Sequence, residues 1–121
     1  MTEGEEFRVI VAGSRNFNNY TLLEATLDRL LARKANIVIV SGAARGADTL
    51  GEQYAAARGL KCIRMPADWD KHGKSAGYKR NEEMAKIGHA AVLFWDGVSK
   101  GTEHMANLAQ RYKLSLRIIK I

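Results

Sequence analysis

The stretch VIVAGSR at residues 9–15 is an apolar run that passes directly into a glycine, a hydroxyl and a cation. An apolar run also passes into a glycine-rich polar segment in IVIVSGAARGAD at residues 37–48 and in AVLFWDGVSKGT at residues 91–102. Such short runs are typical of strands buried in a parallel sheet, and these sheets bind ligands at the carboxyl ends of their strands. Three glycine-rich loops on one edge, each with a basic residue, predict a site for a phosphorylated ligand.

Helical patterns separate the apolar runs. We expect strands at residues 7–12, 37–40, 61–65, 91–95 and 116–121, and helices at residues 21–33, 47–58, 75–87 and 102–112. Thr21 and Glu24 have the spacing of a capping box, and Gly59 stands where a helix-ending glycine is expected. The alternation of strands and helices predicts a three-layer α/β/α fold around a mostly parallel five-stranded sheet. The long irregular stretch at residues 67–74 is expected to be functional or mobile.

The composition is that of a globular protein of one domain. The 121 residues carry a net charge of +6, which favours nucleic acid or phosphorylated small molecules as partners, although solubility alone would also account for it. The single Cys62 cannot form an internal disulfide and fits a buried strand position in a reducing compartment. No apolar stretch approaches the roughly 18 residues that cross a bilayer, and the acidic N-terminus is unlike a signal peptide. We therefore expect a cytoplasmic protein without membrane association.

The first two loops offer groups that suit a phosphate. Gly13 permits close backbone approach, Ser14 offers a hydroxyl and Arg15 a planar cation, although a tight turn with a solvated arginine would have the same sequence. In the second loop, small residues leave backbone N–H groups free to face an anion at the start of a helix. Its candidate ligand-binding residues are Ser41, Gly42, Ala43, Arg45 and Gly46. Asp48 is expected to complement the helix dipole, to bind a ribose hydroxyl or to interact with Arg45.

The loop after the fourth strand repeats this chemistry. Its candidate ligand-binding residues are Asp96, Ser99, Lys100, Gly101 and Thr102. Glycines, hydroxyls and a lysine before a helix predict a second phosphate cradle, in which Asp96 could hold a hydroxyl or an amino group. Thr102 also fits the N-cap of the helix that follows.

The segment at residues 71–81 is dense in hydrogen-bond donors, a pattern that also fits a solvated basic face. Gly77 interrupts a helical pattern at a cost of about 1 kcal/mol relative to alanine, which indicates close approach of a ligand or another backbone. Arg80 and Asn81 are expected to face the edge of the sheet and to bind the ligand. Trp69 is the aromatic side chain best placed to stack on a base. The three histidines lack companions for a metal ion, so no metal site is expected.

Four segments in this order, GSR at 13–15, SGAARGAD at 41–48, AGYKRN at 76–81 and SKGT at 99–102, resemble the YspA/YpsA-related branch of the SLOG superfamily. The superfamily includes the lonely-guy phosphoribohydrolases and the DNA-processing protein DprA. The resemblance extends from Arg8 to about Lys113. It implies a Rossmann-like fold that forms one ligand-binding domain over residues 1–121 and assembles as a homo-oligomer. It also implies a nucleotide or nucleotide-derived ligand, such as ADP-ribose, over the first, second and fourth strands.

The resemblance leaves the activity open. The phosphoribohydrolases carry a P-G-G-x-G-T-x-x-E motif whose glutamate helps to cleave an N-glycosidic bond, but Met105 stands at that position here. Glu103 lies two residues earlier, about 200° around the helix. Catalysis would therefore need Asp48, Asp96 or Glu103 as its acid or base.

Three functions follow from these observations. The first is a domain without a cofactor that binds a nucleotide-derived ligand as a sensor or accessory module. The second is a nucleotide hydrolase that acts on an N-glycosidic or phosphate bond. The third is binding of single-stranded nucleic acid.

Overall fold

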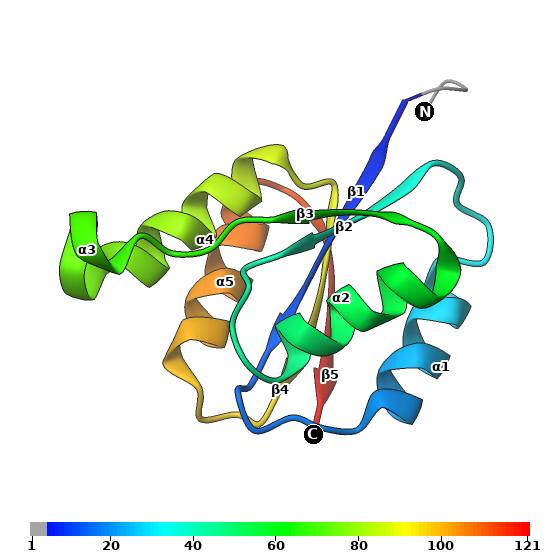
Figure 1. Ribbon diagram of the computed structural model, residues 1–121, viewed down its shortest axis with the longest axis horizontal. Helices are drawn as coiled ribbons and strands as arrows, with labels where there is room; N and C mark the ends of the chain where they lie inside the picture. Colours follow the sequence, from blue (N-terminus) through cyan, green and yellow to red (C-terminus); the bar gives the residue numbers. More distant parts are fainter. Residues whose placement is uncertain (1–4) are drawn as a thin grey trace.

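The structure, a computed structural model, describes residues 5–121 and consists of one five-stranded sheet between two layers of helices (Figure 1). All neighbouring strands are parallel, in the order β3-β2-β1-β4-β5. The strands are β1 (Phe7–Gly13), β2 (Ile37–Ser41), β3 (Lys61–Arg64), β4 (Ala90–Trp95) and β5 (Ser115–Lys120). The predicted Rossmann-like α/β fold is confirmed, with every strand parallel.

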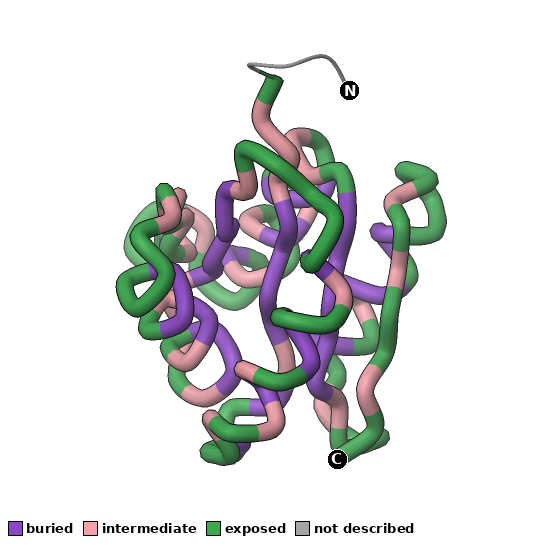
Figure 2. Tube along the Cα trace, turned by 90° about the vertical axis from the view of Figure 1, so that its right-hand side faces the viewer, coloured by how far each residue is buried: buried purple, intermediate pink, exposed green. Residues whose placement is uncertain are grey.

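Two helices cover each face of the sheet. On one face lie α1 (Tyr20–Leu30) and α2 (Ala47–Arg58), and on the other lie α4 (Ala76–Ile87) and α5 (Lys100–Arg111). Side chains of β1 alternate between the layers, because Val9 and Val11 pack toward α1 and α2 whereas Ile10 and Ala12 pack toward α4 and α5. Burial on both faces explains why the central strands read as continuous apolar runs. Figure 2 shows this buried centre flanked by exposed outer segments.

The strand order changes direction once, between β3 and β4. The chain moves outward from β1 through β2 to β3, and then returns along α4 to place β4 on the opposite side of β1. The connections after β1 and β4 therefore diverge at the carboxyl edge, where Gly13 pairs with Phe94. Open α/β sheets bind their ligands in the crevice at such a switch point.

Two local predictions are wrong. The first helix is not capped by Thr21: Asn19 is its N-cap, and the Asn19 side chain accepts a hydrogen bond from the Leu22 N–H at 3.0 Å. The stretch at 67–74 is not irregular throughout, since it contains α3 (Trp69–His72) and the start of a 3₁₀ turn, η1 (Gly73–Ser75). Asp68 caps α3 by accepting a hydrogen bond from the Lys71 N–H. The spacing of apolar residues, on which the prediction of helices depends, gives no sign of such a local bond.

Two other expectations concern Gly59 and Cys62. Gly59 ends α2 in the left-handed conformation, with φ of 65°, as predicted. Cys62 lies in β3 but is only half-buried, because β3 is an edge strand of the sheet. No helix within residues 5–121 is long and apolar enough to cross a membrane.

Candidate functional site

Three adjoining cavities lie at the carboxyl edge of the sheet, and Arg15 and Arg80 line all three. The inner cavity, about 70 Å³, reaches down to Asp48 and to the start of α5. The aromatic cavity, about 220 Å³, lies between Trp69 and Tyr78. The outer cavity, about 410 Å³, follows the loop after β2. The two arginines therefore stand where the three cavities join.

Arg15 and Arg80 bring two cations together. Arg15 is exposed after the end of β1, and its guanidinium forms no ion pair or hydrogen bond with residues 5–121. Arg80 is half-buried on α4, donates from Nη1 to the Gly42 carbonyl, and donates from Nε to Asn81 Oδ1 at 2.9 Å. Burial lowers the pKa of Arg80, the charge of Asp48 raises it, and the charge of Arg15 lowers it again. Two like charges that converge in this way favour an anion between them.

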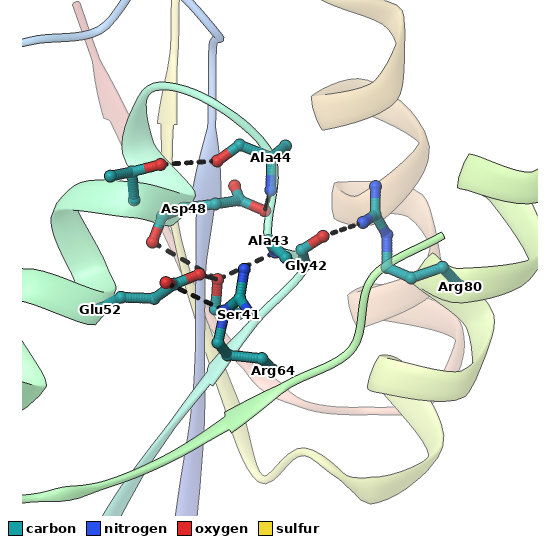
Figure 3. Close-up of polar contacts among 9 residues, drawn as sticks. Ser41, Gly42, Ala43, Ala44, Asp48, Glu52, Arg64 and Arg80 are labelled. Atoms are coloured by element: carbon teal, nitrogen blue, oxygen red, sulfur yellow. Dashed lines mark hydrogen bonds and ion pairs between the residues drawn. The ribbon is translucent and has the colours of Figure 1, made fainter. Parts of the chain in front are cut away.

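Asp48 is the acidic residue of the inner cavity, and it is 4% exposed. Burial raises its pKa to about 6, against the lowering effects of the Ala44 N–H, the Arg80 charge and the Gly42 N–H. The Ala44 N–H donates to Oδ2 at 3.4 Å. The cation whose charge lowers the pKa of Asp48 is thus Arg80 from the opposite layer, across the loop after β2 (Figure 3). Arg45 is exposed.

The loop after β2 is held from beneath by Ser41, which is fully buried. Its Oγ donates to Glu52 Oε2 at 2.6 Å and accepts from the Ala43 N–H at 3.0 Å, while Arg64 forms an ion pair with Glu52 (Figure 3). The expectation that these backbone N–H groups are free to face an anion is therefore wrong for Ala43 and Ala44. The side chains of Ser41 and Asp48 accept from them first, as serine and aspartate commonly do near loops.

Ser14 connects three segments rather than facing a cavity. Its buried hydroxyl accepts from the Asp96 N–H at 3.1 Å, and its carbonyl accepts from the Ala47 N–H at the start of α2 at 3.4 Å. Gly46 has φ of +80°, and a Cβ there would collide with the Ser14 carbonyl. Glycine is required at this position because two backbones touch.

The loop after β4 is organised by Asp96. Its Oδ1 accepts from the N–H groups of Val98 and Ser99, both at 2.8 Å, and these two bonds are the main reason that its pKa is lowered. The N-cap of α5 is Ser99, not Thr102: the Ser99 hydroxyl accepts from the Thr102 N–H at 3.5 Å. The inner cavity is lined here by Ser99, Gly101 and Thr102.

The start of α4 brings further predicted residues to the site. Asn81 is buried and donates from Nδ2 to the Gly101 carbonyl at 3.3 Å, which connects α4 to α5. Gly77 faces Trp69, and a Cβ there would lie 3.5 Å from the indole Cη2, an ordinary contact. The predicted approach of another backbone at Gly77 is therefore not seen among the described residues.

The structure brings some of the predicted residues together and leaves others outside. Lining residues from the predicted set are Gly13, Arg15, Gly42, Ala43, Arg45, Asp48, Gly77, Arg80, Asn81, Ser99, Gly101 and Thr102. Predicted residues that line none of these cavities are Ser14, Ser41, Gly46, Asp96, Lys100 and Glu103. Of the three candidate acids or bases, only Asp48 therefore has contact with a cavity.

Two methionines that line the inner cavity are not among the site residues predicted from the sequence. Met84 and Met105, from α4 and α5, are buried and line it. Met105, which stands where the phosphoribohydrolase motif has its glutamate, therefore presents a thioether to this cavity and not a carboxylate. Within residues 5–121, no group of three or more His, Cys, Asp or Glu side chains could hold a metal ion.

Residues 7–72 match the model of the YspA, cpYpsA-related SLOG family. The chain belongs to this family. The SLOG chain is also 35% identical over 111 residues to the Gene 61 protein of Mycobacterium phage D29, covering 86% of this chain and 89% of that protein.

Solved structures share the fold of the SLOG chain. DNA processing protein A (DprA) of Helicobacter pylori, described by its single-stranded DNA binding mode, superposes with a TM-score of 0.71 at 24% identity. DprA of Streptococcus pneumoniae gives 0.73 at 19% identity, and the protein TM1055 gives 0.66 at 17% identity. Each comparison covers 93% of this chain. The chain spans 64% of the first DprA chain, 50% of the second and 72% of TM1055.

Proposed function

We propose that this SLOG domain binds a nucleotide or a nucleotide-derived ligand, with a phosphate between Arg15 and Arg80, and acts as a sensor or accessory module. One observation carries the proposal: the two guanidinium groups converge where three cavities join, and that of Arg15 has no ion-pair or hydrogen-bond partner among the described residues. Asp48 is the single carboxylate among the lining residues of these cavities, which leaves their surface strongly positive.

Neighbouring groups support a ligand larger than phosphate. The start of α5 adds the hydroxyls of Ser99 and Thr102 and the small Gly101 to the wall of the inner cavity. Helix N-termini attract anions because their first N–H groups and the helix dipole both present positive charge. The outer cavity extends this surface along Gly42, Ala43 and Arg45, which gives room for a ribose or a second phosphate.

Isothermal titration calorimetry with nucleoside monophosphates, ADP-ribose and NAD tests the proposal, with inorganic phosphate as a reference. We expect at least one nucleotide to bind more tightly than phosphate, and Arg15→Met to weaken that binding at least about tenfold, because a charge-assisted hydrogen bond is lost. Arg33→Met is the matched control, since Arg33 is exposed and precedes β2 at the opposite edge of the sheet. Equal losses in both variants would contradict a specific phosphate site.

A second candidate function is binding of single-stranded nucleic acid. It is favoured by two aromatic side chains beside the arginines, Trp69 at 53% exposure and Tyr78 at 47%, since bases of single strands stack on such surfaces. Fluorescence anisotropy with a labelled oligonucleotide separates the two functions. Strand binding predicts an affinity that falls steeply with salt and is not reversed by a mononucleotide competitor.

The homo-oligomer is also a proposal. The edge strand β5 is free on one side within the described chain, and its Ile118 is 43% exposed, so it offers a surface for a second copy. Light scattering that gives the mass of one 13.4 kDa chain would overturn this proposal.

A further inference from the structure

One wall of the aromatic cavity is the exposed indole of Trp69, which is not part of the hydrophobic core. Trp69 lines both the aromatic and the outer cavity, so the exposed indole stands between them rather than in the core. Gly77 lies against the rim of the indole: a Cβ there would make an ordinary van der Waals contact, 3.5 Å from Trp69 Cη2 and 4.0 Å from Arg80 Nη2. A longer side chain at residue 77 would fill the space between the indole and the arginine.

The segment that carries Trp69 is held by local hydrogen bonds. None of the residues of α3 is buried, yet Asp68 accepts from the Lys71 N–H at 3.1 Å and the Ser75 hydroxyl donates to the His72 carbonyl at 2.9 Å. A short surface helix with no buried residue adds little to the core. Its clear structural consequence is to hold an indole beside Arg15 and Arg80.

The polar groups of the aromatic cavity are mostly hydrogen-bond donors. Lys74 and Arg15 line it with cations, and no carboxylate does. The Oδ1 of Asn81 already accepts from Arg80 Nε, and its Nδ2 donates to the Gly101 carbonyl. A nucleobase bound in this cavity would therefore face hydrogen-bond donors, those of Lys74 and Arg15, along its polar edge. Guanine and hypoxanthine present the O6 and N7 acceptors that lysine and arginine bind, whereas adenine presents an amino donor at the same position.

We propose that the aromatic cavity is a nucleobase subsite in which Trp69 stacks on the base and Lys74 selects a 6-oxopurine over adenine. The inference rests on the proposed function, which places the phosphate between Arg15 and Arg80 next to this cavity. It deepens that function by naming the ligand class as an oxopurine nucleotide.

Calorimetric titrations with GMP, IMP, AMP and ribose 5-phosphate test the subsite. We expect GMP and IMP to bind about tenfold more tightly than AMP, the discrimination that one good contact to a base edge provides. Trp69→Ala should weaken all three nucleotides by about tenfold, toward ribose 5-phosphate, because stacking is lost. Lys74→Met should bring GMP and IMP to the affinity of AMP and leave AMP unchanged. The control is Lys71→Met, since Lys71 is exposed and lines none of the three cavities.

The outcomes separate the two proposals. Equal binding of GMP and AMP, or a preference that survives Lys74→Met, overturns the oxopurine subsite. Nucleotides that bind no better than ribose 5-phosphate overturn the base subsite while the phosphate site stands. If ribose 5-phosphate and all nucleotides fail to bind, the proposed function fails and the subsite fails with it.

Discussion

Asp48 and Arg80 reach the same side of Gly42 from opposite layers of the fold. A Cβ on Gly42 would lie 2.7 Å from Asp48 Oδ2 and 2.6 Å from Arg80 Nη1, so both groups occupy the space that a side chain would need. Arg80 also donates to the Gly42 carbonyl, and Asp48 accepts from the Ala44 N–H. The loop after β2 is therefore held between an anion of α2 and a cation of α4.

Gly42→Ala should disturb both groups. The added methyl must push away Asp48 or Arg80, so we expect a loss of about 1–3 kcal/mol in the free energy of unfolding, the usual cost of overpacking, together with weaker nucleotide binding. Urea denaturation measures the first effect and calorimetry the second. Gly101→Ala is the stability control, because no side chain or backbone atom from beyond its own helical turns and chain neighbours lies within 4 Å of its Cβ position, and alanine favours the helix. A Gly42→Ala variant as stable as the parent would contradict this geometry.

Asp48 should make stability depend on pH. Its pKa of about 6 lies roughly two units above the ordinary 3.8, so the folded protein holds this proton more tightly than the unfolded chain. The stability it contributes is present below pH 3.8 and is lost as the pH rises to 6. Above pH 6, Asp48→Asn should be more stable than the parent by up to about 3 kcal/mol, and below about pH 3 the difference should vanish.

Thermal or urea unfolding of both proteins at several pH values measures this difference. Asp70→Asn, at an exposed position on α3, is the control for the replacement of a carboxylate by an amide. An Asp48→Asn variant that is less stable than the parent at pH 8 would show that the charge of Asp48 stabilises the fold.

Gly46→Ala and Gly59→Ala separate backbone strain from collision. Both glycines have positive φ, +80° and +65°, but only at Gly46 does a Cβ meet backbone, the Ser14 and Arg15 carbonyls. Gly59→Ala should cost about 1 kcal/mol, and Gly46→Ala should cost several times more or prevent folding. Circular dichroism with urea titration compares the two, and equal costs would contradict the close approach of α2 to the loop after β1.

Ser14→Ala should act on stability and not on ligand binding. Removal of the hydroxyl leaves the Asp96 N–H without its acceptor, at a cost of about 1 kcal/mol. We expect nucleotide affinity to stay within about twofold, because Ser14 lines none of the cavities. Ser115→Ala is the matched control for the loss of a hydroxyl, because Ser115 is exposed on β5 and lines none of the three cavities. A large loss of affinity in Ser14→Ala would show that Ser14 takes part in ligand binding after all.

The three carboxylates test the hydrolase alternative. Any release of free base or phosphate from a nucleotide should be abolished in Asp48→Asn and retained in Glu103→Gln, because Asp48 alone of the candidates lines a cavity and has a pKa near neutrality. Product analysis by chromatography measures the release. Retained turnover in Asp48→Asn would remove Asp48 as the acid or base.

Much of the fold was predictable because its signals are local. Apolar runs such as 9–12 and 37–40 predict strands, and the helical spacing between them predicts the crossovers. The small cap of α1 at Asn19 and the short α3 were not predictable, since each depends on one side chain that accepts from one nearby N–H. The candidate site was predictable as an edge of the sheet, because parallel strands bring their carboxyl ends together.

The sequence by itself determined the order of strands and helices, the position of the three loops and the basic residues that each loop carries. Only the tertiary structure decided which of these groups face a cavity. Ser14, Ser41 and Asp96 have the right chemistry for a ligand, but each already binds a backbone N–H of its own or a neighbouring loop. Arg15 and Arg80, 65 positions apart, converge because the chain returns across β1 at the switch point. Hydrogen-bond partners are chosen by distance in space, which the spacing along the chain does not encode.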